Sequence, residues 1–292
     1  MNIDNKRINK EEFELLVSLV QGKDVINEKH EKLIEKGYVN KNGITELGLT
    51  LLEPYKVKRV VIIAAGFGVR LVPITINTPK PLVRVNGVRI IDTLLDAISQ
   101  AGIEEIYIVR GYLKEQFDQL LEKYPNIKFI DNLSYNEANN ISSILKAGDI
   151  ISNSYVMEAD LLLKNKKLVR KYEYSSNFLG FKVEQSEDWC FTVKDGIITD
   201  QVVGANAKDY KGFDIYQEIG ISYWDNGDGK KIAKDIIDAF NLPNGKNLYW
   251  DQLMFKIFPE RYQVELRECQ KDDVLEIDTF KELQAVDSAY KV

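Results

Sequence analysis

The sequence predicts an α/β protein in which a small helical domain precedes an open, Rossmann-like, mixed and mainly parallel sheet. The first observation is a change of pattern near residue 58, where helical periodicity gives way to apolar runs that alternate with helical stretches. The second is the run VVIIAA at residues 60–65, which is apolar at every position, as is typical of a parallel strand covered on both faces. With 292 residues, 45% of them hydrophobic, the chain is long enough to bury such a core.

Residues 1–57 are predicted to form a domain of their own. The expected elements are helices over residues 11–22 and 26–37, a hairpin turned at Asn42-Gly43, and a helix over residues 47–55. This order of elements resembles a small winged helix-turn-helix domain.

The charge of this segment argues against tight DNA binding. It carries nine Lys and Arg residues against ten Asp and Glu residues, a net charge of −1, and the whole chain carries −6 with a pI near 5.2. The candidate recognition helix, residues 27–36, mixes lysines with glutamates and so lacks the basic stripe that DNA phosphates attract. We expect a packing or dimerisation module that allows a homodimer, with nucleic-acid binding as the less favoured alternative.

Residues 58–292 are predicted to form the second domain. The first part is expected to contain strands over residues 59–66, 104–111, 127–132 and 154–160, and helices over residues 89–102, 113–124 and 140–151. The second part is expected to contain a hairpin turned at Asp195-Gly196, a strand over residues 218–225, and helices over residues 230–240 and 249–258. Because parallel strands end at one edge of a sheet, we expect a ligand at that edge.

The stretch VVIIAAGFGVRLVPITINTPKPL, residues 60–82, joins the first strand to a loop with two glycines, three prolines and two cations. Glycines directly after a buried strand allow the backbone to approach a phosphate group closely. The loop is not a Walker A motif, and it lacks the third glycine of the dinucleotide fingerprint. Arg70 and Lys80, on a chain stiffened by the prolines, are placed to hold a triphosphate.

Residues 64–82 resemble the pattern A-A-G-x-G-[ST]-R-[LM]-x-P-[LM]-T followed by P-K-[PA]-[LM], which is typical of nucleotidyltransferases. Val69 and Ile74 depart from it, and Val69 removes a hydroxyl near the phosphates. Later segments resemble bacterial CTP:phosphocholine cytidylyltransferases of the LicC type, namely GYLKEQFD, YNEANNISS, SYVMEAD, ISYWD, LYWDQL and LEIDT. The resemblance implies a nucleotide-diphospho-sugar transferase-like fold.

The resemblance also implies the residues that bind the nucleotide and a metal. Nucleotide contacts are expected from Ala64, Ala65, Gly66, Gly68, Arg70, Lys80, Gly111, Tyr112, Asn139, Asn140 and Ser143. Asp160 and Asp278 are expected to bind Mg²⁺, which favours carboxylate and phosphate oxygens, and Glu158 is expected to support them. Arg70, Lys80, Asp160 and Asp278 are thus the predicted catalytic residues.

Aromatic residues of the second half are the candidates for the acceptor pocket, because aromatic faces attract quaternary ammonium groups. The expected pocket contains Trp189, Tyr223, Trp224, Tyr249 and Trp250, with the acids Glu218 and Asp251. Core packing is an equal alternative for each single ring, since Trp and Tyr are common in protein interiors.

The resemblance implies transfer of CMP from CTP to phosphocholine, which gives CDP-choline and pyrophosphate. The acceptor phosphate is largely anionic near neutral pH, so no general base is needed. Alternatives are phosphoethanolamine, 2-aminoethylphosphonate or a sugar 1-phosphate as acceptor, and a DNA-binding regulator that senses a nucleotide. The absence of an apolar leader or a long apolar run predicts a cytoplasmic protein with reduced thiols at Cys190 and Cys269.

Overall fold

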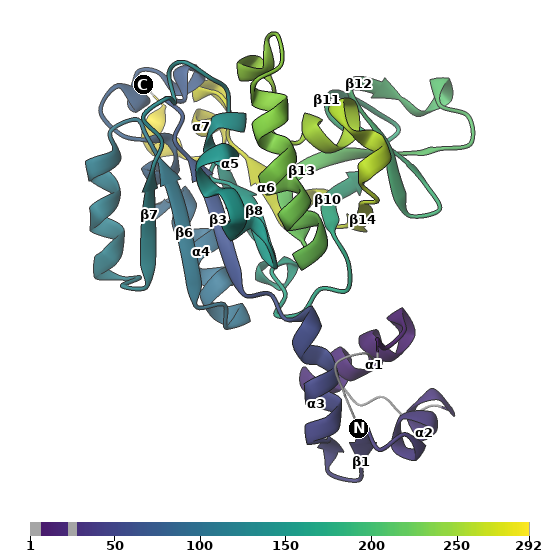
Figure 1. Ribbon diagram of the computed structural model, residues 1–292. Coiled ribbons are helices and arrows are strands. Elements are labelled where there is room, and N and C mark those ends of the chain that lie inside the picture. Colours follow the sequence, from purple (N-terminus) through teal and green to yellow (C-terminus); the bar gives the residue numbers. More distant parts are fainter. Residues whose placement is uncertain (1–6, 23–27, 292) are drawn as a thin grey trace. The chain divides into compact units, whose positions relative to one another are not determined.

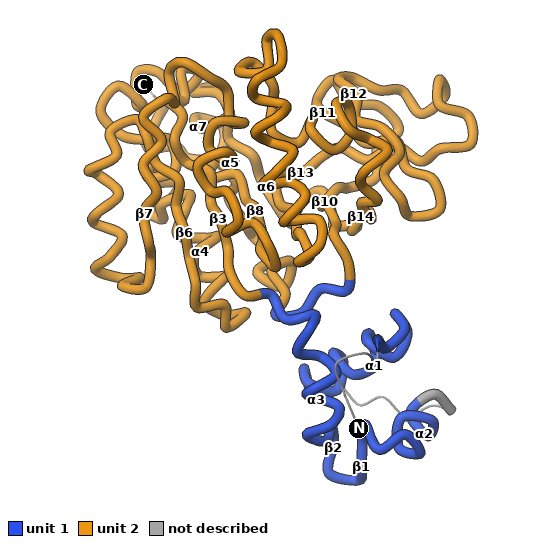
Figure 2. Tube along the Cα trace, viewed as in Figure 1, with its two compact units in different colours: residues 1–57, 171–174 blue, residues 58–170, 175–292 orange. Residues whose placement is uncertain are grey.

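The computed structural model describes residues 7–22 and 28–291. Figure 1 shows the arrangement of the elements, and Figure 2 shows the two compact units into which the chain divides. Unit 1 comprises residues 1–57 and 171–174, and unit 2 comprises residues 58–170 and 175–292. The sequence did not indicate that residues 171–174 join unit 1.

Unit 1 contains two helices, a short hairpin and a third helix. Its elements are α1 (Lys10–Val20), α2 (Glu28–Glu35), β1 (Val39–Asn40), β2 (Gly43–Ile44) and α3 (Glu46–Leu52). Asn9 caps α1 through a capping box with Glu12, which satisfies backbone donors at the helix start. The predicted order is confirmed, although the hairpin turn lies at residues 41–42, one residue early, because Asn40 pairs with Gly43. The predicted start of the second helix at residues 26–27 lies outside the described residues.

The core of unit 1 includes Tyr172, which belongs to the segment 171–174. Phe13, Leu16 and Leu52 are buried together with Tyr172. The rings of Tyr55 and Tyr174 stack at 5.3 Å between centroids. These contacts explain why residues 171–174 belong to this unit.

Unit 2 is built on a nine-stranded mixed sheet with the order β10-β14-β12-β11-β13-β8-β3-β6-β7. Four neighbouring strands are parallel, namely β8 (Ser154–Glu158), β3 (Arg59–Ala64), β6 (Glu105–Arg110) and β7 (Ile127–Asp131). The strand β3 is buried at almost every position, as its continuous apolar run predicts. The alternating first half of unit 2 is therefore confirmed.

The other strands of the sheet pair mainly antiparallel. They are β10 (Asn177–Lys182), β11 (Gln185–Lys194), β12 (Ile197–Asn206), β13 (Asp214–Trp224) and β14 (Glu265–Glu268). β13 joins this half to β8, and β10 also pairs with β13, so the five strands form a closed circuit of pairings. The antiparallel share of the sheet is larger than the sequence indicated. The hairpin between β11 and β12 turns at Asp195-Gly196, as predicted, with positive φ at both residues.

Helices cover the sheet (Figure 1), and two small strand pairs of unit 2 form separate two-stranded sheets. The helices are α4 (Ile90–Ala101), α5 (Ile141–Ala147), α6 (Asn226–Phe240) and α7 (Phe280–Val286), and the small pairs are β4 (Arg84–Val85) with β5 (Val88–Arg89) and β9 (Leu161–Leu163) with β15 (Val274–Glu276). Two predicted helices differ in type: residues 114–122 form a 3₁₀ helix, and residues 253–257 form a π-helical turn.

Cys190 and Cys269 are free and buried. Among the described residues, no helix is long and apolar enough to cross a membrane.

Candidate active site

The loop that follows β3 forms one wall of the candidate site. Gly68 precedes a short 3₁₀ turn and has a φ of +70°, a left-handed conformation that favours glycine. Its carbonyl accepts a hydrogen bond from Thr75 Oγ1 at 2.9 Å. A Cβ atom at position 68 would lie 3.0 Å from Lys80 Cβ, so the loop folds back closely on itself. This fold places Lys80 beside the glycine turn.

Lys80 is the centre of an ion-pair network that joins distant parts of the chain. Its Nζ donates to Asp160 Oδ2 and to Asp278 Oδ1, each at 2.8 Å. Arg70 Nη2 lies 2.9 Å from the same Asp278 oxygen. Lys80 is only 9% exposed, whereas the Arg70 side chain is 64% exposed. The structure thus brings the four predicted catalytic residues together, with one cation buried and the other open to solvent.

The short strand pair β9–β15 brings the C-terminal segment to Asp160. Glu276 lies opposite Leu161 in the antiparallel register. Ile277 N, the next residue along, donates to the Asp160 carbonyl at 3.4 Å. Asp278 follows directly, and this pairing accounts for its place beside Asp160.

A separate buried cluster holds Arg70 and Asp278 side by side. Leu71 and Ile277 both belong to this cluster and are both fully buried. Each is the chain neighbour of a charged residue of the network. Apolar packing therefore positions Arg70 against Asp278, and their ion pair does not have to do so alone.

The carboxylates keep Lys80 charged in spite of its burial. Burial by itself lowers the pKa of a lysine, but the charges of Asp160 and Asp278 outweigh it and raise the pKa of Lys80 above its ordinary value. A permanent cation is thus held near the ends of β3 and β8, where it can bind a phosphate oxygen.

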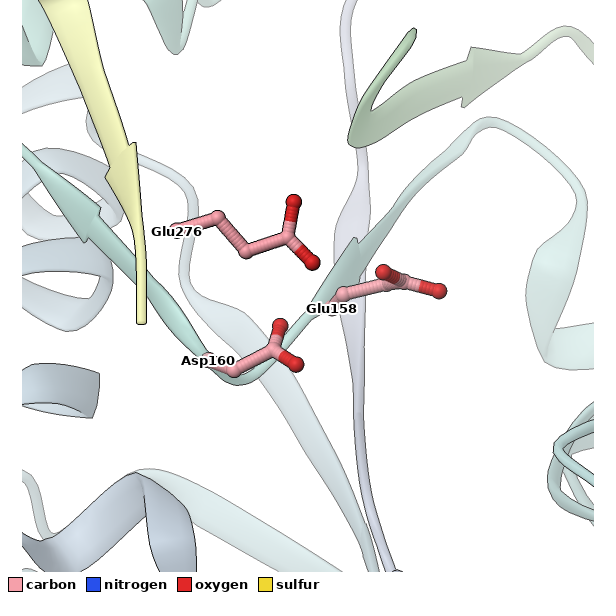
Figure 3. Close-up of side chains that lie close together, drawn as sticks. All are labelled: Glu158, Asp160 and Glu276. Carbon is pink, nitrogen blue, oxygen red and sulfur yellow. The ribbon is translucent and has the colours of Figure 1, made fainter. Parts of the chain in front are cut away.

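Two further carboxylates, those of Glu158 and Glu276, lie beside Asp160 (Figure 3). One carboxylate oxygen from each of Glu158, Asp160 and Glu276 lies within 4.8 Å of the others. Burial, and then the charge of Asp160, raises the pKa of Glu158 well above its usual value and that of Glu276 to about 8. Crowded acids of this kind are stabilised when a cation binds among them.

The donors of this group fit a divalent metal ion. Asp160 Oδ1 is buried and has no hydrogen-bond partner among residues 7–22 and 28–291, while Oδ2 is bonded to Lys80. Carboxylate oxygens are the ligands that Mg²⁺ prefers. Asp278 is not one of these three residues, and its Oδ1 lies beside Lys80 and Arg70. Glu276, which the sequence analysis missed, has a carboxylate oxygen within 4.8 Å of one of the predicted metal ligand Asp160.

The position of Glu158 depends on a glycine in the neighbouring strand. A Cβ atom at Gly220 of β13 would lie 2.7 Å from both Cγ and Oε2 of Glu158. Asn140 Nδ2 donates to Glu158 Oε1 at 3.4 Å, and Asn140 Oδ1 accepts from Trp250 N at 2.8 Å. Glu158 is therefore held by a close strand contact and by an amide that also fixes the chain at Trp250.

The predicted nucleotide-binding residues near β3 fall into buried and exposed positions. Ala64 and Ala65 are buried at the end of the strand, and Gly66 is exposed. Tyr112 N donates to the Ala65 carbonyl at 3.0 Å, which ties the Gly111-Tyr112 segment to this strand end. The two segments thus lie side by side, as the nucleotide prediction requires.

The predicted residues at the start of α5 have mainly structural contacts. The side chains of Asn139 and Asn140 bond to the chain at residues 247–250. Ser143 is 3% exposed, and its hydroxyl accepts a hydrogen bond from Asn132. Ser143 faces the interior, which argues against the predicted contact of its side chain with a nucleotide.

Three of the five predicted acceptor-pocket rings belong to the core. Tyr223, Trp224 and Trp250 are 1%, 0% and 2% exposed, so they present no open face to a ligand. The Trp224 and Trp250 rings pack edge to face at 5.8 Å, and Trp224 Nε1 donates to Ser222 Oγ at 2.9 Å. The sequence prediction is corrected here, because sequence alone does not distinguish an aromatic cage from an aromatic core.

The other two rings lie together near the surface. The centroids of Trp189 and Tyr249 are 5.5 Å apart, and Tyr249 is 42% exposed. Close by in sequence, Asp251 is buried and shares a hydrogen-bond donor with Glu218. The donor is Gln201 Nε2, which lies 2.7 Å from Glu218 Oε2 and also bonds Asp251 Oδ2.

Burial strongly affects this acidic pair. It raises the pKa of Glu218 well above its usual value, with the charge of Asp251 as the next cause, and it raises the pKa of Asp251 as well. Gln201 was missed by the sequence analysis, because a single glutamine within a strand carries no motif.

The fold and the site together define a nucleotidyltransferase: a glycine turn after a buried parallel strand, a buried lysine, and acids gathered at the strand ends. The chain belongs to the nucleotidyl transferase family, whose profile matches residues 59–193.

Similar proteins match about four fifths of the chain. A 2-aminoethylphosphonate cytidylyltransferase of Lancefieldella rimae is 34% identical over 233 residues, 79% of this chain and 92% of that protein. A choline-phosphate cytidylyltransferase of Streptococcus pneumoniae is 31% identical over 233 residues, 80% of this chain and 98% of that protein. A solved structure of CTP:phosphocholine cytidylyltransferase from Streptococcus pneumoniae superposes with a TM-score of 0.70 at 31% identity and covers 81% of this chain and 100% of that one.

Proposed function

We propose that this nucleotidyltransferase moves CMP from CTP to an acceptor with a phosphate or phosphonate at one end and an ammonium group at the other. The observation that carries the proposal is the network in which buried Lys80 joins Asp160 and Asp278 at the strand ends. Support for CTP comes from the relatives at 34% and 31% identity, which are cytidylyltransferases.

In the proposed reaction an anionic oxygen of the acceptor attacks the α-phosphorus of CTP. A bond forms between that oxygen and the α-phosphorus, and the bond from the α-phosphorus to the β-phosphate oxygen breaks, so pyrophosphate leaves. Lys80 and Arg70 stabilise the charge on the phosphates. Catalysis then depends on alignment of the two substrates, because the nucleophile is already deprotonated near neutral pH.

We propose that Mg²⁺ binds at Asp160, with Glu276 and Glu158 beside it and Asp278 as the further ligand that the family resemblance implies. When bound, the ion neutralises triphosphate charge. The backbone from Ala64 to Gly68 and the Gly111-Tyr112 segment are the proposed contacts of the nucleotide. Asn139 and Asn140 support the nucleotide site indirectly, because their side chains bond the segment at residues 247–250.

The acceptor's ammonium end is proposed to lie near Trp189 and Tyr249, with Glu218 and Asp251 supplying negative charge. A primary ammonium, as in 2-aminoethylphosphonate or phosphoethanolamine, is favoured, because the acidic pair offers hydrogen-bond acceptors and three of the predicted cage rings are buried. Phosphocholine is the second candidate, because the Trp189–Tyr249 pair can contact a quaternary ammonium.

A matrix of four nucleoside triphosphates against these three acceptors and a sugar 1-phosphate tests the proposal. The measurement is pyrophosphate release by the full chain with Mg²⁺. We expect release only with CTP and an ammonium-bearing acceptor. Two results contradict the proposal: pyrophosphate release only with the sugar 1-phosphate, and no release with any of the acceptors tested.

A further inference from the structure

The buried glutamine between the two acids has one polar atom that its neighbours leave unsatisfied. Gln201 is 0% exposed, and its Nε2 donates to both Glu218 and Asp251. Its carbonyl oxygen, Oε1, is also buried and accepts no hydrogen bond within the described part of the chain. A buried carbonyl oxygen without a hydrogen-bond donor is unfavourable. A ligand that donates an N–H to this oxygen therefore gains binding free energy.

The strand register places Gln201 on the same face of the sheet as Trp189. Gln201 lies opposite Phe191 and Val203 lies opposite Trp189, so all four side chains share one face of the β11–β12 hairpin. On the other side of β11, Phe191 pairs with Tyr216 of β13. Glu218, two residues further along β13, therefore lies on the same face.

The orientation of the amide is fixed by its two acidic partners. Both hydrogens of Nε2 are committed to carboxylates on different segments, β13 and the chain after Trp250. An amide flip would direct Oε1 at these carboxylates and leave them without a shared donor. Oε1 is therefore held as an acceptor, and the acidic pair is held ready for a cation.

We infer that Gln201 Oε1 accepts an N–H from the ammonium group of the acceptor and makes the enzyme selective for a primary ammonium over a quaternary one. This inference rests on the proposed function. A primary ammonium has three N–H donors, and Gln201, Glu218 and Asp251 supply one acceptor group each. A trimethylammonium has none, so it leaves Oε1 unsatisfied and brings methyl groups against it. Gln201 is thus a specificity-determining residue of the acceptor pocket.

The first test uses the unaltered full chain and a graded set of acceptors. Phosphoethanolamine, its N-methyl and N,N-dimethyl derivatives, and phosphocholine lose one N–H donor at each step. With CTP and Mg²⁺, we expect kcat/KM to fall along this series, by about 10- to 100-fold from first to last, the range that a hydrogen bond to a charged group supports. A flat series, or one that rises towards phosphocholine, overturns the inference.

The second test replaces the amide by a side chain of similar length in Gln201→Met. We expect the ratio of kcat/KM for phosphoethanolamine to that for phosphocholine to fall at least about tenfold, mainly through the KM of phosphoethanolamine, with the KM of CTP unchanged. The matched control is Gln217→Met on β13, whose side chain bonds Asp188 and Ser186 on the other face of the sheet. The control should keep the wild-type ratio.

The outcomes separate this inference from the proposed function. If the wild-type chain releases no pyrophosphate from CTP with any ammonium-bearing acceptor, the proposed function fails. If it does so but Gln201→Met retains the wild-type selectivity ratio, the function stands and the role of Gln201 is wrong. If Gln201→Met does not fold, the acceptor series on the wild-type chain tests the inference by itself: a flat or rising series overturns it, and a falling series supports it.

Discussion

Lys80 Nζ lies 2.8 Å from Asp160 Oδ2, although 80 residues separate the two in the sequence. The pair links the loop after β3 to the end of β8, and it is shielded from solvent on the lysine side. Shielding strengthens the attraction, because fewer water molecules screen the two charges. The site is therefore preformed around a fixed cation, which is the arrangement expected for binding a triphosphate.

Replacing Lys80 by methionine should remove catalysis while leaving a folded chain. We expect kcat to fall by about 10²- to 10³-fold, because a positioned cation that stabilises charge in the transition state typically contributes that much. Pyrophosphate release from CTP measures the effect. The control is Lys182→Met, which breaks an exposed ion pair with Asp214 and should leave kcat unchanged. Near-wild-type turnover in Lys80→Met would show that the lysine only stabilises the fold.

The acidic residues of the site should differ in how their replacement affects Mg²⁺-dependent turnover. Chelation should abolish turnover and added Mg²⁺ should restore it. We expect Asp160→Asn and Asp278→Asn to be inactive but folded, and Glu276→Gln to need a higher Mg²⁺ concentration for half-maximal rate, because one charged ligand of the group is lost. A Mg²⁺ titration monitored by turnover and by thermal melting measures this. Wild-type activity in Asp278→Asn, or an unchanged titration in Glu276→Gln, contradicts these assignments.

Gly220→Ala should disturb Glu158, because the added Cβ would lie 2.7 Å from its side chain. We expect a loss of about 1–3 kcal/mol in the free energy of unfolding, measured by urea denaturation. The double variant Gly220→Ala/Glu158→Gly should recover most of this loss relative to Glu158→Gly alone, since the Cβ, Cγ and Oε2 atoms that crowd the added Cβ are all gone. Equal losses from Gly220→Ala in both backgrounds would mean that Glu158 is not the source of the crowding.

The two groups of aromatic residues should respond differently to truncation. Trp224→Ala removes a fully buried ring and should cost about 3–5 kcal/mol of stability. Trp189→Ala should leave stability nearly unchanged and raise the KM of a quaternary acceptor by about 2- to 30-fold, the range of a cation–π contact. Urea denaturation and acceptor kinetics distinguish the two. If Trp189→Ala lowers the free energy of unfolding but leaves the KM of the acceptor unchanged, Trp189 is not part of the acceptor pocket.

Unit 1 should not bind DNA. Residues 1–57 carry a net charge of −1, which gives little attraction to phosphates. We expect no mobility shift of labelled duplex DNA by the full chain at low salt. A shift that weakens steeply as salt is added would instead favour the winged-helix regulator considered from the sequence.

The sequence predicted the parts of the site that follow from strand order and from one motif. The apolar run of β3 and the loop with Arg70 and Lys80 identified the ligand edge of the sheet. The metal-binding role of Asp160 was implied by the family resemblance. The convergence of Asp278 needed the family resemblance, because the β9–β15 pairing is too short to be seen in a hydrophobic pattern. Glu276 had a signal that was not used: it stands two residues before Asp278, as Glu158 stands before Asp160.

The acceptor end was harder to predict for a physical reason. Tryptophan and tyrosine serve equally well in cores and in cages, and only burial separates Trp224 from Trp189. Gln201 had no sequence signal, since its partners lie 17 and 50 residues away on other elements. Tertiary contacts alone create the acidic pair and its shared amide.

The most direct test of the central claim is ³¹P NMR of the full chain with CTP, Mg²⁺ and 2-aminoethylphosphonate. The account predicts that pyrophosphate appears in step with a product in which the phosphonate phosphorus is joined through oxygen to CMP. It is contradicted if CTP stays intact with 2-aminoethylphosphonate, phosphoethanolamine and phosphocholine alike, or if CTP is hydrolysed to CMP without any change in the acceptor resonance.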